Sequence, residues 1–197
     1  VNQGGEAAAH LNPQVRVRLV ADTTLNARLT LGDGSTTIST QTSPSVGAYV
    51  NATPGSLKLA VNGRTLALPS TDAAAGADLT LLVHGDAASP NAVILKDDNR
   101  APTAPTKSKL RLVHGINGLA TPIALDVDYA TVASSVGYAS ASTPATVVAT
   151  SGMRFEVSAA GRSVHLDTDV NLSTQSVYTV FMLGDSASPV HILRKDR

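Results

Sequence analysis

An internal repeat is the feature that most constrains the fold of this chain. Residues 81–90 recur as residues 180–189, and both copies end in the letters Gly-Asp-x-Ala-Ser-Pro. Two further segments match at similar offsets: residues 18–20 with 111–113, and residues 63–64 with 161–162. Self-similarity at a fixed spacing is the signature of a repeated structural unit. The 197-residue chain is therefore predicted to contain two copies of one module.

The repeat divides the chain into four parts. We expect the first module over residues 15–100 and the second over residues 108–197. Between them, residues 101–107 form a linker rich in proline and threonine, and its two prolines favour an extended, semi-stiff backbone. Residues 1–14 carry no periodic pattern, so we expect a flexible leader or a docked extension there.

Within each module, apolar and polar residues alternate with a period of two, which is typical of β-strands with one buried face. In residues 15–19, for example, valine and leucine alternate with Arg16 and Arg18, and we expect such arginines to lie on solvated faces. Turn signals separate the strands, and Asn62-Gly63 predicts a tight hairpin. The pattern predicts an all-β fold of two tandem antiparallel β-sandwich modules, with about seven strands each.

Charge and composition argue against several classes of function. Fifteen basic residues balance fifteen acidic ones, so no net positive charge favours nucleic acid or an anionic membrane surface. Aromatic residues make up 3% of the chain and tryptophan is absent, which leaves few platforms for stacking bases. Without cysteine, disulfides and thiolate metal sites are excluded. No apolar run approaches the ~18 residues of a membrane span, so we expect no transmembrane segment.

The composition also favours export. Only 15% of the residues are charged, and the chain is rich in alanine, serine and threonine, as exported β-proteins commonly are. A chain without cysteine also suits an oxidising compartment. We therefore expect a secreted or cell-envelope protein, in the periplasm or at the cell surface. A signal peptide or a lipidated cysteine in a preceding segment is left open.

The order of motifs in the second module resembles a known family. Residues 110–115 read Leu-Arg-Leu-Val-His-Gly, residues 122–127 read Pro-Ile-Ala-Leu-Asp-Val, a strand preceded by glycine follows at residues 152–157, and Tyr-Thr-Val occupies residues 178–180. This order resembles the bacterial family catalogued as domain of unknown function 4397, and the first module matches it less closely. The resemblance implies tandem immunoglobulin-like sandwiches in an exported or lipid-anchored envelope protein. It implies no catalytic residues, because the family has none established.

Four residues at strand ends and turns are candidate ligand-binding residues: His84, Asp86, His114 and Asp185. Each histidine occurs in Val-His-Gly, where a neutral imidazole could bind zinc or copper, but neither histidine is retained between the two copies. The two aspartates recur in the repeated turn and could bind calcium through carboxylate oxygens. An aspartate after glycine more often hydrogen-bonds its own backbone. We therefore favour ordinary hydrogen bonding at all four, with no metal and no cofactor.

Four other ring side chains carry structural expectations. We expect His165 to point outward from its strand, and His191, in the slot of Val93, to be packed or half-buried. Tyr49 and Tyr138 each follow a Val-Gly pair closely, so we expect them to occupy equivalent packing corners of the two modules.

The sequence contains none of the short motifs that would indicate an enzyme. A Gly-x-Ser-x-Gly elbow, a phosphate-binding glycine loop and a dinucleotide fingerprint are all missing, so we predict a non-enzymatic protein with no catalytic residues. Our leading interpretation is a structural or protein-interaction module of the envelope, which pairs with a protein partner or with itself through exposed edge strands. The alternative is a small-ligand or metal-binding module that uses the rim loops.

Overall fold

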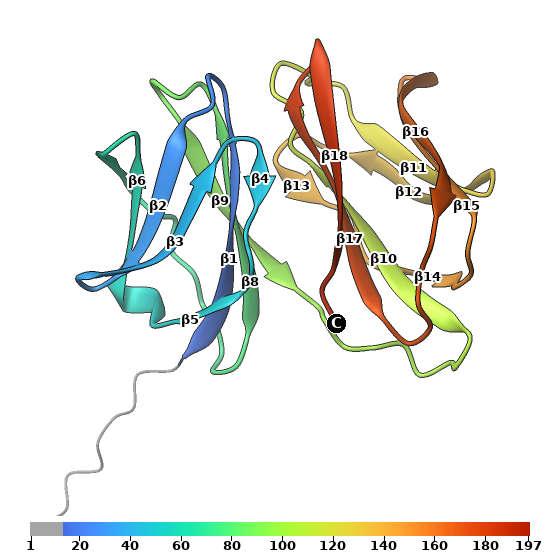
Figure 1. Cartoon of the computed structure of the whole chain (residues 1–197), viewed down its shortest axis with the longest axis horizontal. Helices are drawn as coiled ribbons and strands as arrows, with labels where there is room; N and C mark the ends of the chain where they lie inside the picture. The colour runs from blue at the N-terminus through green and yellow to red at the C-terminus, as the bar shows by residue number, and fades with distance from the viewer. Residues whose placement is uncertain (1–13) are drawn as a thin grey trace, which may run out of the picture.

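The computed structural model describes residues 14–197, which form two β-sandwich modules. The expected leader lies almost entirely outside the described residues. Figure 1 shows four sheets side by side, from the outer sheet of the first module at the left to the outer sheet of the second module at the right. The prediction of an all-β fold with two tandem sandwiches is confirmed.

The first module contains nine strands and one short 3-10 helix, η1 (Pro54–Ser56). The alternation pattern predicted about seven strands, and three of the nine, β4, β5 and β7, have only two or three residues. The strands are β1 (Val15–Thr23), β2 (Arg28–Asp33), β3 (Thr36–Thr42), β4 (Ser45–Val46), β5 (Val50–Ala52), β6 (Leu57–Val61), β7 (Arg64–Leu66), β8 (Asp78–Gly85) and β9 (Asn91–Asp97).

The second module repeats this arrangement with nine further strands. They are β10 (Lys107–His114), β11 (Ile123–Val127), β12 (Ala130–Val136), β13 (Ser140–Ala141), β14 (Ala145–Val148), β15 (Met153–Ala159), β16 (Arg162–Val170), β17 (Val177–Asp185) and β18 (Ser188–Lys195).

Each module pairs an outer sheet with an inner sheet. The outer sheets have the strand orders β3-β2-β6-β7 and β12-β11-β15-β16, and the inner sheets have the orders β4-β1-β8-β9 and β13-β10-β17-β18. Strands β5 and β14 join the inner sheets by pairing with β1 and β10. The predicted hairpin is present between β6 and β7, where Asn62 and Gly63 have φ angles of 49° and 79°.

One strand pair in each inner sheet runs parallel, which the sequence did not predict. β1 pairs with β8, and β10 pairs with β17, over six or more residues each. The predicted antiparallel sandwiches therefore each contain one parallel strand pair. Alternation along a strand indicates which face is buried, but it says nothing about the direction of the neighbouring strand.

The inner sheets are buried on both faces. Along β1, Val17 and Leu19 point into the core of the first module, whereas Arg18 and Val20 face the second module. Arg18 is 2% exposed and Arg111 is 7% exposed, so the prediction that the alternating arginines mark solvated faces is wrong for both. The faces opposite the core are covered by the other module instead of by water.

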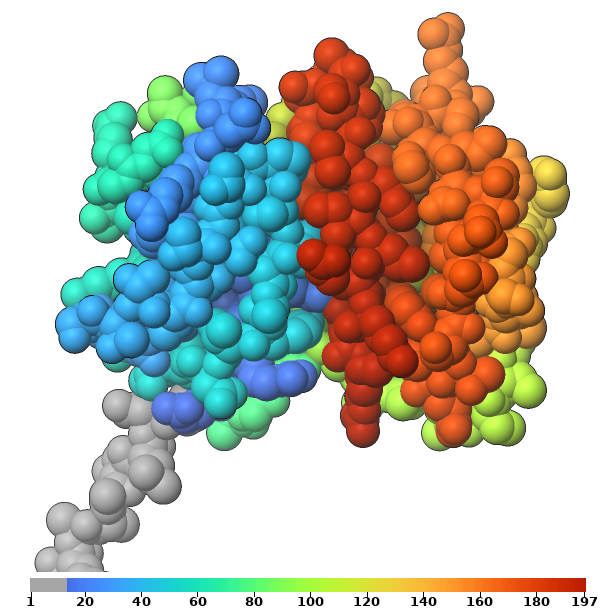
Figure 2. All heavy atoms as spheres, viewed as in Figure 1, coloured from blue at the N-terminus to red at the C-terminus, as the bar shows by residue number. Residues whose placement is uncertain are grey.

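An apolar patch fills the middle of the interface between the modules. It combines residues of both inner sheets: Val20, Val46, Leu82, Val113, Phe181 and Leu183. In Figure 2 the red residues of β18 lie directly against the blue and cyan residues of the first module, and Arg194 Nη2 donates a hydrogen bond of 3.1 Å to the carbonyl oxygen of Val46. Burial of this patch holds the two sandwiches together. Among residues 14–197, no helix has the length and apolar character needed to cross a membrane.

Candidate functional site

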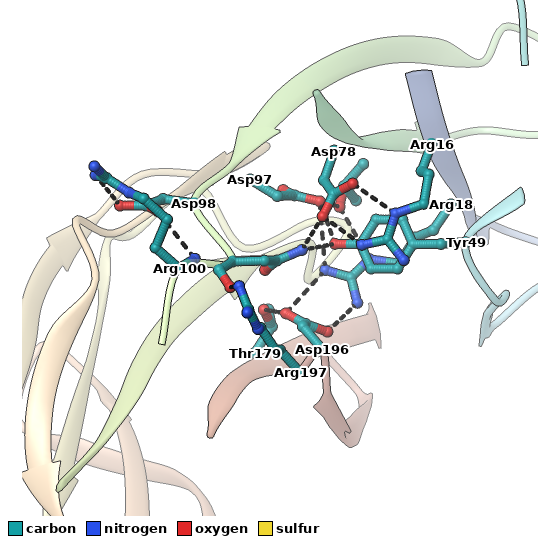
Figure 3. A network of polar contacts seen from close by, with 12 residues as sticks. Arg16, Arg18, Tyr49, Asp78, Asp97, Asp98, Arg100, Thr179, Asp196 and Arg197 are labelled. Atoms are coloured by element: carbon teal, nitrogen blue, oxygen red, sulfur yellow. Dashed lines mark hydrogen bonds and ion pairs between the residues drawn. The ribbon is translucent and has the colours of Figure 1, made fainter. Parts of the chain in front are cut away.

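A network of buried charges lies at one end of the interface between the modules (Figure 3). We call Arg18, Asp97, Arg111 and Asp196 the arginine–aspartate network. Arg18 Nη1 donates to Asp196 Oδ1 at 2.5 Å, and Arg111 Nη2 donates to Asp97 Oδ1. Since Arg18 and Arg111 are repeat counterparts, and Asp97 and Asp196 are too, the arginine of each module binds the aspartate of the other. Exchanging the two modules would therefore interchange the two contacts.

Two threonines complete the hydrogen bonding of the network. Thr80 and Thr179, also repeat counterparts, donate to the aspartate of their own module at 2.6 Å. Arg18 Nε donates to the hydroxyl of Thr80 at 3.0 Å, and Arg111 Nε donates to that of Thr179 at 3.3 Å. Buried charges are stable only when such additional hydrogen bonds satisfy them.

Arg18 also lies between two aromatic rings, one from each module. Its guanidinium carbon is 4.6 Å from the ring centroid of Tyr49 and 4.8 Å from that of Phe181. The Tyr49 hydroxyl donates to Asp97 Oδ2 at 2.5 Å, and burial together with the charge of Asp97 raises the pKa of this phenol. The phenol therefore acts as a hydrogen-bond donor to the network at neutral pH.

Tyr49 and Tyr138 are not structural equivalents, contrary to the prediction. Val20 pairs with Val46 in the first module, and its counterpart Val113 pairs with Ala141 in the second, which sets an offset of 95 residues for this part of the repeat. At that offset the counterpart of Tyr49 is a proline, and Tyr138 lies before β13. The two Val-Gly pairs that suggested equivalence lie at different places in the modules.

A second polar cluster lies at the other end of the interface. We call His84, His114, Asn117 and Tyr138 the histidine–tyrosine cluster. The ring of Tyr138 stands edge-on to both histidines, with centroid distances of 4.9 Å to His84 and 5.7 Å to His114. The Tyr138 hydroxyl donates to Asn117 Oδ1 at 2.5 Å, and His84 Nδ1 lies 2.8 Å from that hydroxyl oxygen. With the tyrosine proton directed to Asn117, His84 Nδ1–H is the donor to Tyr138.

Asn117 connects this cluster to the first module. Its Oδ1 accepts from the Gly85 N–H at 2.9 Å, and its Nδ2 donates to the main-chain oxygen of Asp22 at 2.6 Å. The Asp22 carboxyl accepts from the Gly184 N–H through Oδ1, but its buried Oδ2 has no hydrogen-bond partner in the described part of the chain. Burial raises the pKa of Asp22 to about 8, so this carboxyl is largely neutral at pH 7. Asn117 and Asp22 lie in no recognisable motif, so sequence reasoning did not find them.

The structure brings only two of the four predicted site residues together. His84 and His114 both contact Tyr138, and burial lowers the pKa of each. His114 is fully buried: its Nδ1 accepts from the Ile116 N–H, and its Nε2 donates to the carbonyl oxygen of Thr121. These bonds occupy both ring nitrogens of His114.

The two predicted aspartates lie in exposed turns and hydrogen-bond their own backbone. Asp86 accepts from the Ala88 N–H at 2.9 Å, and Asp185 accepts from the N–H groups of Ala187 and Ser188 at 2.9 and 2.8 Å. Each carboxylate thereby stabilises the repeated turn before Ser-Pro.

A third group of polar residues was not found from the sequence. His165 and Asp167 of β16 meet His191 of β18 at the edge of the second sandwich. His165 pairs with a core residue, Val157, and its Nε2 is buried, so the prediction that it points outward is wrong. His191 is half-buried, as predicted, but the strand register makes it the counterpart of Ala92, one residue before the predicted Val93.

A cleft of about 570 Å³ opens beside the arginine–aspartate network. Both signs of charge line it, and they are paired with each other: Arg16 with Asp78 at 2.6 Å, and Arg100 with Asp98 at 2.8 Å. Burial acts to raise the pKa of Asp78, but hydrogen bonds from Arg16 and Asn99 outweigh it and lower that pKa. Arg197 also lines the cleft, and its Nη1 donates a hydrogen bond of 3.4 Å to the carbonyl oxygen of Asn99.

Comparison with known proteins gives a family but no function. No curated protein matches the chain. The family described as Domain of unknown function (DUF4397) matches residues 13–122, which include the whole first module and the opening strand of the second. The match thus lies mainly on the copy that resembles the family less closely by motif order. Since it covers more than half of the 197 residues, the chain belongs to the DUF4397 family.

Proposed function

We propose that this chain is a non-enzymatic structural or protein-interaction module of an exported bacterial envelope or surface protein. In this proposal the module binds a protein partner, or a second copy of itself, by strand addition along β3. The observation that carries the proposal is the character of this strand. Within residues 14–197, β3 is an edge of its sheet and pairs only with β2, and it contains no charged residue, proline or glycine over seven residues.

Long edge strands usually carry a charge, a proline or a bulge, because their free N–H and C=O groups pair readily with other chains. The edges β7, β9, β16 and β18 carry arginine, lysine or aspartate in this way. β12 is also uncharged, but its pairing with β11 contains two register shifts, whereas the pairing of β3 with β2 contains one. β3 is therefore the long edge best suited to strand addition.

The two interface clusters support a structural role. Three contacts of these clusters cross between the modules: Arg18 to Asp196, Arg111 to Asp97, and Asn117 to the main chain of Asp22. They support a fixed presentation of β3 relative to the second sandwich. The low charge content and the lack of cysteine support export. A ligand site in the rim loops is not advanced, since Asp86, Asp185 and His114 are engaged in internal hydrogen bonds.

Sedimentation velocity over a wide concentration range tests self-association of the chain. The variant Thr37→Lys/Thr40→Lys places two charges on exposed positions of β3, and we expect it to remove the association that the parent shows. The matched control, Thr65→Lys/Thr168→Lys, places the same charges on exposed positions of β7 and β16, which already carry charges.

A photo-crosslinker placed at Thr40 in the native cell tests whether β3 binds a different protein instead of a second copy of the chain. Crosslinks that form at Thr40 but not at Thr168 support strand addition at β3. A chain that stays monomeric at every concentration and forms no crosslink at Thr40 contradicts the proposal.

A further inference from the structure

Three potential metal ligands meet where the two sheets of the second sandwich end. His165 and Asp167 come from β16, the edge of the outer sheet, and His191 comes from β18, the edge of the inner sheet. One ring nitrogen of each histidine and one carboxylate oxygen of Asp167 all lie within 4.8 Å of one another.

The strand register directs all three side chains into the gap between the sheets. In an antiparallel pair, residues opposite each other project from the same face. His165 pairs with Val157, Asp167 pairs with Phe155, and His191 pairs with Met182. All three of these neighbours are core residues. The open edge of the apolar core is therefore closed by two imidazoles and a carboxylate.

The two imidazoles leave polar atoms unsatisfied. The Nε2 atoms of His165 and His191 are both buried and have no hydrogen-bond partner among residues 14–197. The rings lie parallel, with centroids 4.2 Å apart and planes inclined by 10°. A buried polar atom without a partner destabilises the fold, so two of them side by side need an explanation. A cation bound between the rings would supply the missing interaction.

The first module shows that the fold does not require these residues. By strand register, the counterpart of His191 is Ala92. The counterpart of His165 is Leu66, because His165 pairs with Val157 and Leu66 pairs with the corresponding Leu59. There the edge is closed by apolar side chains, with Leu66, Leu68 and Ala92 packed against the core. The polar trio is thus a particular feature of the second module.

We propose that His165, Asp167 and His191 bind a divalent transition-metal ion. Two imidazole nitrogens and one carboxylate oxygen form a ligand set suited to Zn²⁺ and Cu²⁺, and Cu²⁺ generally binds such sites most tightly. Three protein ligands leave at least one coordination position for water or for a group from a binding partner.

Binding requires only a small local adjustment. In a tetrahedral site with bonds of about 2.1 Å, ligand atoms lie about 3.4 Å apart. The three ligand atoms lie within 4.8 Å of one another, so each pair must close by no more than about 1.4 Å, and the rings must tilt out of their parallel stack. The bound ion would cross-link β16 to β18 and so join the two sheets of the sandwich at an edge that no main-chain hydrogen bond closes.

Titration of the whole chain with ZnCl₂ by calorimetry, and with CuCl₂ by electron paramagnetic resonance, tests the site. We expect one tightly bound equivalent of each ion and a copper spectrum with coupling to two imidazole nitrogens. His191→Ala, which places in β18 the residue found at the counterpart Ala92, should weaken binding at least about tenfold and leave coupling to one nitrogen.

Asp167→Asn retains the shape of the side chain and serves as the test if His191→Ala does not fold. Its matched control is Asp169→Asn, two residues further along β16 and exposed. His10→Ala controls for histidine binding elsewhere in the chain. We expect Asp167→Asn to lose affinity and both controls to keep it. Absence of a one-equivalent site in the parent chain, or affinity and copper coupling unchanged in His191→Ala and Asp167→Asn, overturns the proposal.

Discussion

The guanidinium group of Arg18 forms an ion pair with the carboxylate of Asp196, 178 residues later in the chain, and both side chains are almost completely buried. The counterpart pair, Arg111 with Asp97, forms the same contact in the opposite direction. Exchange of identical contacts between two copies is the geometry of an isologous dimer interface. The two modules therefore associate as the subunits of a symmetric dimer do, with a short linker between them.

Replacement of Arg18 by methionine should destabilise the folded chain strongly. Methionine preserves part of the apolar stem, but it leaves the carboxylate of Asp196 buried without its charge partner. Removal of one member of a buried ion pair typically costs about 3–5 kcal/mol. We expect a loss of this size in the free energy of unfolding, measured by urea denaturation.

Arg16→Met is the matched control, because Arg16 lies two residues earlier on β1 and pairs with Asp78. The Arg16 side chain is 46% exposed, so water screens the pair and its loss should cost no more than about 1 kcal/mol. Equal losses of unfolding free energy in the two variants would show that the buried pair stabilises the chain no more than the exposed pair does.

The contrast between Arg16 and Arg18 also shows how far sequence reasoning reaches. The period of two and the repeat were sufficient to predict strands, turns and two sandwiches, because these depend on local alternation and backbone conformation. Alternation places both arginines on the same face of β1, but it does not reveal what covers that face. For Arg18 the answer depends on Asp196, which directly follows the last strand, and no local pattern contains that information.

The group formed by His165, Asp167 and His191 was not found from the sequence for a similar reason. His165 and His191 belong to different sheets, and their separation of 26 residues matches no spacing of metal ligands within one element. The expectation that His165 points outward assigned the wrong face to this part of β16, whose pairing with β15 contains register shifts. A register shift of one residue reverses the face on which every following side chain lies.

The stability of the chain should depend on the charge of Asp22. The folded-state pKa of about 8 lies above the usual 3.8, so the folded state retains a proton that the unfolded state releases between these two values. Stability therefore falls as pH rises from about 4 to about 8, by up to about 1.4 kcal/mol per pH unit. Urea denaturation at pH 6.5 and pH 7.5 measures this contribution.

Asp22→Asn isolates the effect, because asparagine matches the shape of the neutral carboxyl and can still accept from the Gly184 N–H. Burial lowers the pKa of the nearby His84 and His114, and these histidines alter stability in the opposite sense below their unfolded pKa. The comparison is therefore the difference between parent and variant. As pH rises, the free energy of unfolding of Asp22→Asn should increase relative to that of the parent. If the difference between the two free energies does not change with pH, Asp22 is ionised in the folded state.

Gly115→Ala should disturb the contact between the modules. A Cβ atom at Gly115 would lie 2.5 Å from Asp22 Oδ2 and 2.9 Å from a methyl group of Leu183. Both neighbours are buried, so the backbone must shift, at a cost of about 1–3 kcal/mol. Gly55→Ala is the control, since its Cβ would meet no atom within 4 Å. A melting temperature lowered equally by both substitutions would argue against close contact at Gly115.

Tyr138→Phe should weaken the histidine–tyrosine cluster without altering its packing. The phenyl ring retains the edge-on contacts, but His84 Nδ1–H loses its acceptor and Asn117 Oδ1 keeps only the Gly85 N–H. An unsatisfied buried donor costs about 1–3 kcal/mol, and this loss should appear in the free energy of unfolding together with faster exchange of the Gly85 amide proton.

Tyr129→Phe is the control, because Tyr129 is 80% exposed and its hydroxyl remains in contact with water. A surface change of that kind typically stays within about 0.5 kcal/mol. If Tyr138→Phe is equally mild and Gly85 exchanges no faster, the hydroxyl does not connect the two modules.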